Sequence, residues 1–153
     1  MSNNEKIQWN IIGNQKDADE FMKSVFGFHD SCLKEFSYLS GAYVKDDLSM
    51  VPLNSIRALK IIIQRQFKEN SMIELKFEGV RKLVLNPDDE NYTCEILDSE
   101  LVFKDGLIWW TDGSVENDEI PKTFLVCSDG LKWRAIEGYM GEDEFYCTAE
   151  RNS

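Results

Sequence analysis

Histidine is nearly absent from this chain, since His29 is the only one among 153 residues. Zinc sites built from histidine pairs are therefore excluded, and none of the four cysteines stands in a C-x-x-C pair. The sequence also lacks the glycine pattern of a phosphate-binding loop and a G-x-S-x-G nucleophile elbow. We therefore expect a protein that is not an enzyme and that holds no metal and no cofactor.

Long apolar runs are missing as well. No segment approaches the roughly 18–20 apolar residues that a membrane-spanning helix needs. The first ten residues have neither the basic start nor the apolar stretch of a secretory signal. We therefore expect no membrane association and a cytoplasmic location. In a reducing cytoplasm free thiols are expected at all four cysteines: Cys32, Cys94, Cys127 and Cys147.

Basic residues are few, because 17 Lys and Arg stand against 28 Asp and Glu, for a net charge of −11. Such a balance argues against nucleic acid and anionic membranes as partners, since both are polyanions. It favours a basic protein partner, although solubility alone is an equally physical reason for it. Several short loops carry the acidic excess: 46–47, 88–90, 116–119 and 142–144.

One stretch of the chain, residues 58–85, has the pattern of a long antiparallel hairpin. Apolar residues recur at every second position on both sides of a polar turn at 68–70, which places them on one face. With a three-residue turn, Ile63 lies opposite Leu75 and Ile61 lies opposite Phe77. The residues expected in the core are Leu59, Ile61, Ile63, Ile73, Leu75 and Phe77.

Other segments have equally local signals. A helix is expected from Asp17 to Phe26, with Asp17 as its N-cap and Glu20 at the capping-box position. A strand is expected over residues 31–40, followed by a loop over 42–54 with one short extended piece. Gly79 falls where the apolar alternation changes phase, which indicates a β-bulge.

Two Asp-Gly pairs predict hairpin turns, because both central residues of a type I′ turn need positive φ. The turn at 105–106 places Phe103 opposite Ile108 and Leu101 opposite Trp110. The turn at 129–130 places Val126 opposite Trp133.

These elements together predict an α+β fold in a single domain spanning residues 1–153. We expect a mainly antiparallel sheet of roughly seven or eight strands, with the one N-terminal helix packed on it. The sheet is curled, folded into two layers or barrel-like; strands joined by short turns fit a closed barrel equally well. Composition leaves the oligomeric state open.

The segment His29-Asp30-Ser31-Cys32 holds the only histidine beside a carboxylate, a hydroxyl and a thiol. A hydrolase-like enzyme that uses His29 as base and Cys32 as nucleophile is one alternative. Adjacent strand residues point to opposite faces, which argues against contact between His29 and Asp30. The favoured interpretation is structural: both residues form the junction between helix and strand.

Trp109 and Trp110 are adjacent in one predicted strand, so one ring faces the core and the other faces outward. An outward tryptophan anchors an interface or is covered by other parts of the chain. A structural or small-molecule-binding β domain that uses this hairpin is therefore a further alternative. The alternation of acidic residues from Asp112 to Asp118 fails as an EF-hand, because Asn117 and Thr123 stand at its glycine and glutamate positions.

The helix that ends near Gly27, the FHDS segment at 28–31 and the strand IELKFEGVRKLVL at 73–85 resemble small bacterial domains of unknown function. Some of these domains are grouped with the immunity proteins of polymorphic toxin systems. The resemblance covers residues 28–85 and implies a cytoplasmic, non-enzymatic antidote that binds a toxin. His29 and Asp30 are its shared motif positions. The tentative binding residues are thus His29, Asp30, Trp109 and Trp110.

Overall fold

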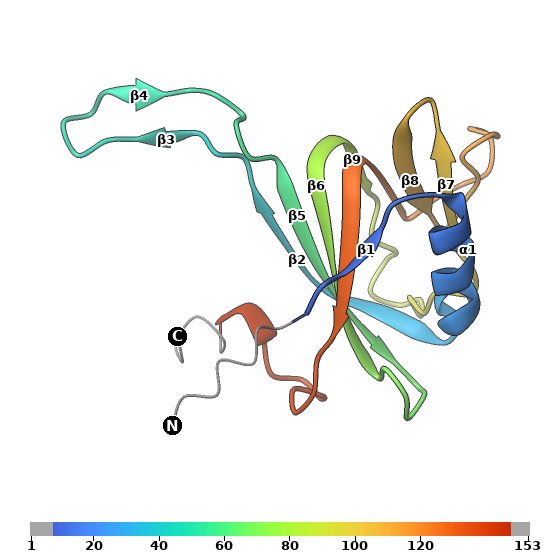
Figure 1. Cartoon of the computed structure of the whole chain (residues 1–153). Coiled ribbons are helices and arrows are strands. Elements are labelled where there is room, and N and C mark those ends of the chain that lie inside the picture. Colours follow the sequence, from blue (N-terminus) through green and yellow to red (C-terminus); the bar gives the residue numbers. More distant parts are fainter. Residues whose placement is uncertain (1–7, 148–153) are drawn as a thin grey trace.

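The computed structural model describes residues 8–147, which form an open antiparallel sheet of seven strands with one main helix (Figure 1). Across the sheet the order is β2 (Ser31–Leu39), β5 (Ala58–Arg65), β6 (Met72–Leu85), β9 (Phe124–Ala135), β8 (Leu107–Thr111) and β7 (Glu100–Lys104). The seventh strand, β1 (Asn10–Ile12), pairs with the second half of β9. The α+β expectation is confirmed, and the sheet is not closed into a barrel. Within residues 8–147 no helix is long and apolar enough to cross a membrane.

Helix α1 (Gln15–Ser24) starts earlier than the sequence pattern predicts, because Asn14 and not Asp17 is its N-cap. The Asn14 side chain accepts a hydrogen bond from the Asp17 amide at 2.8 Å, and the Asp17 carboxylate accepts one from the Gly13 amide at 3.0 Å. The first bond is that of a capping box, whereas the second reaches the amide of the residue before the N-cap. The helix also ends before Phe26, since residues Phe26–Phe28 form the separate 3₁₀ turn η1.

The hairpin of β5 and β6 has the predicted faces but not the predicted register. Ile63 lies opposite Ile73 and Ile61 opposite Leu75, two residues away from the expected pairing. The reason is a longer turn: the Arg65 amide donates to the Ser71 carbonyl oxygen, which leaves residues 66–70 outside the ladder. A shift by an even number of residues keeps every side chain on its face. All six residues predicted for the core are accordingly buried.

The phase change at Gly79 does mark a β-bulge, which lies just after it, between Val80 and Lys82. The hairpin predicted at 129–130 is wrong for a related reason. The register between β6 and β9 shifts after Val80, and Gly79 adopts a φ of +66°. The Asp129 carboxylate lies against Gly79, where Arg81 donates to it at 2.9 Å. Neither Asp129 nor Gly130 takes the positive φ of a type I′ turn. β9 therefore runs straight through them, and Val126 does not pair with Trp133.

The hairpin of β7 and β8 is confirmed in both turn and register. Phe103 lies opposite Ile108 and Leu101 lies opposite Trp110, as the Asp-Gly signal predicts. Helix α1 and turn η1 cover one face of the sheet, here called the front face. The core between them and the sheet includes the buried residues Ala18, Phe21, Val25, Phe28, Leu59, Ile61, Leu75, Phe77, Trp110, Phe124 and Val126. The front core is thus built by residues from nearly the whole described chain.

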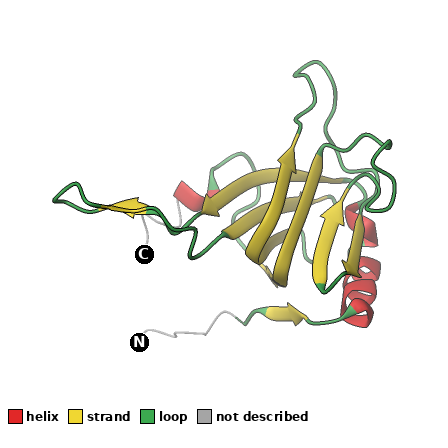
Figure 2. Cartoon of the chain, turned by 90° about the horizontal axis from the view of Figure 1, so that it is seen from above, coloured by secondary structure: helices red, strands yellow, loops and turns green. Residues whose placement is uncertain are grey.

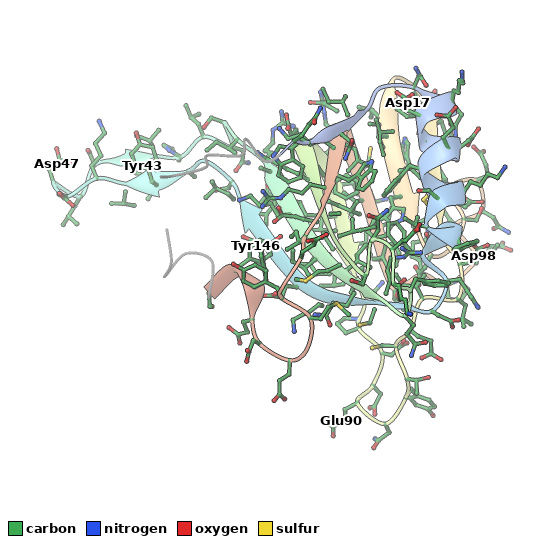
Figure 3. All side chains as sticks on the ribbon, turned by 60° about the horizontal axis from the view of Figure 1, so that its bottom comes forward. Asp17, Tyr43, Asp47, Glu90, Asp98 and Tyr146 are labelled. Carbon is green, nitrogen blue, oxygen red and sulfur yellow. The ribbon has the colours of Figure 1, made fainter. Side chains whose placement is uncertain are left out.

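A smaller core lies on the back face of β5 and β6. The C-terminal segment 136–147 covers this face, and Phe145 is buried there against Ile62 and Met72. The Glu35 carboxylate of β2 anchors the segment, because the Phe145 amide donates to it at 2.7 Å and the Tyr146 amide at 3.3 Å. Figure 3 shows the Tyr146 side chain turned from this segment towards the sheet. The segment therefore belongs to the folded domain.

Replacing Tyr146 with phenylalanine is expected to make the protein more resistant to alkali. Burial and the nearby Glu74 carboxylate raise the pKa of the Tyr146 phenol above its usual value. The folded state then holds this proton more tightly than the unfolded chain, so stability falls as pH rises above about 10. The Tyr146→Phe variant should lack this loss, which is at most about 1.4 kcal/mol per pH unit. Urea unfolding at several alkaline pH values measures it, and equal slopes for both proteins would contradict it.

One part of the chain lies outside both cores. Residues 40–56, here called the arm, include the two-stranded ribbon of β3 (Tyr43–Val44) and β4 (Met50–Val51), where a loop with one extended piece was expected. The arm projects from the end of β2 and β5 away from the rest of the molecule (Figures 1 and 2). The Ser40 carbonyl oxygen fixes its base by accepting from the amides of Ile56 and Arg57.

Candidate functional site

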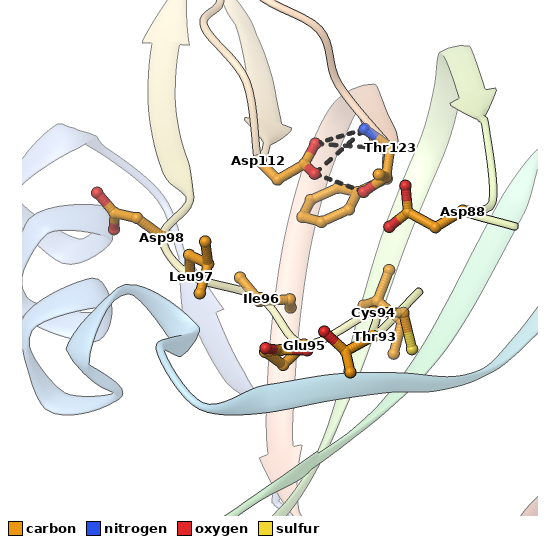
Figure 4. Close-up of a pocket in the computed structure, with 11 residues that line it drawn as sticks. Asp88, Thr93, Cys94, Glu95, Ile96, Leu97, Asp98, Asp112 and Thr123 are labelled. Carbon is orange, nitrogen blue, oxygen red and sulfur yellow. Dashed lines mark hydrogen bonds between the residues drawn. The ribbon is translucent and has the colours of Figure 1, made fainter. Parts of the chain in front are cut away.

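A cavity of about 370 Å³ opens between the 86–98 segment, which joins β6 to β7, and the end of β8 (Figure 4). Two backbone contacts hold this segment in place. The Asn86 amide donates to the Thr123 carbonyl oxygen at 2.7 Å, and Ile96 forms an antiparallel bridge with Ser31 at the start of β2. The segment is therefore anchored at both ends and spans the cavity between them.

Four carboxylates line this cavity, and they come from both of its walls: Asp88, Glu95, Asp98 and Asp112. Among residues 8–147, no lysine or arginine lines it. None of the ion pairs within the described part of the chain uses any of the four. Leu33, Ile96 and Phe124 supply the apolar part of the wall. The cavity therefore combines uncompensated negative charge with an apolar surface.

Two of the four carboxylates also have structural roles. Asp112 accepts hydrogen bonds from the Thr123 amide at 2.9 Å, from the Phe124 amide at 3.2 Å and from the Thr123 hydroxyl, so it fixes the start of β9 (Figure 4). Asp98 accepts from the Ser99 amide at 2.9 Å.

The other two lie on the segment that spans the cavity. A hydrogen bond from the Thr93 side chain lowers the pKa of the Glu95 carboxyl, which keeps it ionised. Asp88 makes no hydrogen bond or ion pair to any described residue. Asp88 and Glu95 are therefore the carboxylates that remain available to a ligand.

His29 and Asp30 lie beside this site, but their hydrogen bonds are made to backbone carbonyl groups. The His29 ring Nδ1 is 2.6 Å from the Leu97 carbonyl oxygen, so Nδ1 carries the proton and donates it. The Asp30 amide donates to the Ile96 carbonyl oxygen at 3.0 Å. Both residues thus fasten the 86–98 segment to the start of β2, which fits the structural interpretation of the FHDS segment.

The expectation that His29 and Asp30 stay apart is wrong. His29 Nε2 is 3.4 Å from the Asp30 carboxylate, because both residues precede β2 and Asp30 has a φ of +57°. Alternation of faces applies only inside a strand. The backbone of Asp30 therefore holds the 86–98 segment, while its side chain lies beside the His29 imidazole.

Cys32 does not have the environment of a nucleophile. Its side chain lines a neighbouring cavity of about 500 Å³ together with Gln64 and Met140, and this cavity shares Glu95 with the acidic one. Burial raises the pKa of the Cys32 thiol, which lowers the thiolate fraction that a nucleophile needs. Cys32, Cys94 and Cys127 are free thiols. Within the described range 8–147, no group of three or more His, Cys, Asp and Glu is arranged to hold a metal ion.

The two tryptophans separate as adjacent strand residues do. Trp110 is 1% exposed in the front core, so its ring is not presented to a ligand or partner. Trp109 is half-buried, and its indole donates to the Lys104 carbonyl oxygen at 3.3 Å. Trp109 lines a small cavity of about 220 Å³ next to the acidic 114–118 loop, on the opposite face of β8 from Trp110, whose ring contacts Phe28. The structure therefore does not bring the four predicted binding residues into one site.

Comparisons with known proteins identify no relative of this chain. A scan against protein-family models finds no match, and searches of the curated proteins and of the solved structures find none either. The function therefore has to be argued from the geometry and charge of the sites themselves.

Proposed function

We propose that this protein is a non-enzymatic interaction domain of the immunity type, which binds a basic protein partner. The acidic cavity carries the proposal. Its carboxylates have no cationic partner in the described chain, so they present a negative patch that is complementary to a basic surface. The FHDS resemblance and the net charge of −11 support the same conclusion.

The shape and lining of the cavity favour a lysine or arginine side chain of the partner. Such side chains place an aliphatic stem along apolar surface and keep a charged head group among polar atoms. Ile96 and Phe124 offer the apolar wall, and Asp88 and Glu95 offer the carboxylates. The net negative charge of the protein adds long-range attraction, which speeds the encounter between the two proteins.

Reversing the charge of Asp88 and Glu95 together is expected to slow association with the basic partner. The first step is to recover that partner on the immobilised full-length protein from the cells that produce it, with elution by salt. Surface plasmon resonance with the recovered protein should then show an on-rate about ten- to a hundredfold lower for Asp88→Lys/Glu95→Lys at low salt. The difference should shrink as added salt shortens the Debye length.

The matched control is Glu142→Lys/Asp143→Lys, which changes the net charge equally; both residues are exposed in the C-terminal loop and neither lines the acidic cavity. Its on-rate should fall much less than that of the cavity variant. Equal losses would mean that only net charge matters, and a recovered partner that is not basic would contradict the proposal. The immunity role adds one requirement: production of this protein must relieve growth inhibition by the partner, and the cavity variant must not.

A further inference from the structure

The arm, residues 40–56, is apolar on both of its faces and covered on neither. Tyr43 and Val44 are neighbours in β3 and point to opposite faces, yet each is more than half exposed. Leu48, at the tip, is the most exposed large apolar residue between residues 8 and 147, at 83%. The other exposed apolar side chains of the arm are Met50, Leu53 and Ile56. An apolar surface of this extent on one projecting element marks an interaction site.

The arm is held in one shape although no other part of the described chain covers it. At the tip, the Lys45 amide donates to the Ser49 carbonyl oxygen at 2.8 Å, and the Asp47 carboxylate accepts from the Ser49 amide at 3.0 Å. At the base, Gly41 has a φ of +97° and lies so close to Ser55 that a Cβ atom would be 2.5 Å from its hydroxyl oxygen. A two-stranded ribbon alone is marginally stable in water, so pairing with a further strand would stabilise it.

The two edges of the ribbon differ. Pro52 directly follows β4 and lacks an amide hydrogen, so it stops a further strand from pairing along that edge. β3 has no proline. Because the Lys45 amide points to β4, the amide and carbonyl of Val44 point away from β4, to the open edge. Val44 therefore offers an unpaired donor and an unpaired acceptor at the same place.

From these observations we propose that the arm is a dimerisation element, whose occupant is the arm of a second copy of this chain. β3 of each copy pairs antiparallel with β3 of the other across a two-fold axis, and each Val44 donates to and accepts from the other Val44. The joined arms form a four-stranded ribbon in the order β4-β3-β3-β4. This contact is isologous, so it closes as a dimer and does not propagate into a fibre.

The distribution of charge favours a second copy over a basic partner at this surface. The arm carries one lysine and two aspartates, so it accounts for only −1 of the net charge of −11. A basic protein finds little opposite charge there, and the arm itself adds only a small part of the repulsion between two acidic copies. Figure 3 shows Tyr43 and Asp47 well away from the side chains of the sheet, so antiparallel arms hold the two acidic bodies at opposite ends.

The contact is small, which predicts a reversible dimer. Edge pairing brings Tyr43 and Val44 of the two copies together, whereas Met50, Leu53 and Ile56 lie on or beyond the outer strand β4. Interfaces smaller than about 1,200 Å² are typical of weak, transient association. The dimer proposal goes beyond binding of a basic partner, because it uses a different surface and because like charges, not opposite charges, meet in it.

Sedimentation equilibrium of the full-length protein tests the dimer. We expect a monomer–dimer equilibrium that shifts towards dimer between about 0.05 M and about 0.5 M NaCl, because salt screens the repulsion between two acidic copies. Binding of a basic partner has the opposite salt dependence, so the two proposals fail separately. A protein that stays monomeric at the higher salt up to about 100 μM would overturn the dimer.

Two variants locate the contact on β3. Val44→Pro removes the amide hydrogen at the open edge and also fixes the local φ, so it is paired with Val44→Lys, which keeps the backbone but adds a charge of the kind that blocks edge pairing. Each should weaken the dimer at least tenfold. The control is Tyr92→Ser, which removes a 74% exposed aromatic side chain from the 86–98 segment and should leave the dimer unchanged.

Amide hydrogen exchange gives an independent measurement on the unmodified protein. The Val44 amide should exchange more slowly as the dimer forms at rising concentration. The exchange rates of exposed amides in the 86–98 segment should not change. A dimer that persists in both Val44 variants with an unprotected Val44 amide would place the contact elsewhere and overturn the proposal. Loss of basic-partner binding in monomeric Val44 variants would do the same, because the arm would then be a partner site.

Discussion

Replacing Trp110 with alanine is expected to lower the free energy of unfolding by about 3–5 kcal/mol, the usual cost of truncating a buried aromatic side chain. The indole contacts three aromatic rings from different parts of the chain: Phe28, Phe77 and Phe124, with centroids 5.7, 6.0 and 4.3 Å away. Its Nε1 also donates to the Ser99 hydroxyl at 3.2 Å, which in turn donates to the Gly27 carbonyl oxygen. The substitution therefore leaves a cavity and also removes a hydrogen-bonded link to η1.

The neighbouring residue provides the control for this prediction. Trp109→Ala deletes the same side chain one position away in β8, but from a half-buried site with one hydrogen bond. Urea unfolding followed by circular dichroism should show a loss of about 1–2 kcal/mol for this variant. Similar losses for the two variants, or a loss below about 1 kcal/mol for Trp110→Ala, would contradict the position of Trp110 at the centre of the front core.

Replacing Arg134 with leucine is the second change expected to have a large effect, with a loss of about 3–5 kcal/mol. Arg134 and Glu74 face each other across β9 and β6, with the guanidinium Nη2 2.7 Å from the carboxylate. The Glu74 side chain is 1% exposed, so the substitution leaves a buried carboxylate without its cation. Trp9, whose ring lies 4.6 Å from the Arg134 guanidinium carbon, also loses its contact.

Lys132 is the matched control, because it lies on the same strand and also approaches the Trp9 ring. Its ion pair with Glu78 at 2.9 Å is partly exposed, and such pairs contribute about 0–1 kcal/mol. Lys132→Leu should therefore have a small effect in the same unfolding experiment. The double variant Glu74→Leu/Arg134→Leu should recover much of the loss, since no buried charge is left unpaired. A double variant as unstable as Arg134→Leu would mean that lost packing explains the effect.

Local signals in the sequence predict those parts of the fold that depend on neighbouring residues. Alternation identifies the buried faces of β5 and β6, and the Asp105-Gly106 pair fixes the β7–β8 register, because each depends on residues within one hairpin. The second Asp-Gly pair fails because its conformation is decided by Gly79, Arg81 and the strands on either side of β9. No pattern within residues 124–135 contains that information.

The candidate site is beyond prediction for the same reason. Asp88 and Asp112 each appear in the sequence as members of ordinary acidic loops. They line one cavity only because β9 places the end of β8 beside the segment that follows β6. Trp110 is the reverse case: adjacency to Trp109 predicts that one ring faces inward, but not which one. The length and the open edge of the arm likewise follow from pairing that a short apolar stretch does not specify.

The strand order has a consequence for how the chain comes to be folded. β9, the last strand made, lies between β6 and β8 and also pairs with β1, the first. Until residues 124–135 leave the ribosome, two separate hairpins, β5–β6 and β7–β8, each expose an edge that β9 will later cover. Contacts of such high sequence separation make folding slow. Nascent or prematurely terminated chains that lack β9 therefore present unpaired strand edges that can aggregate, and shielding by a chaperone matters most after β6 has been made and before β9 is complete.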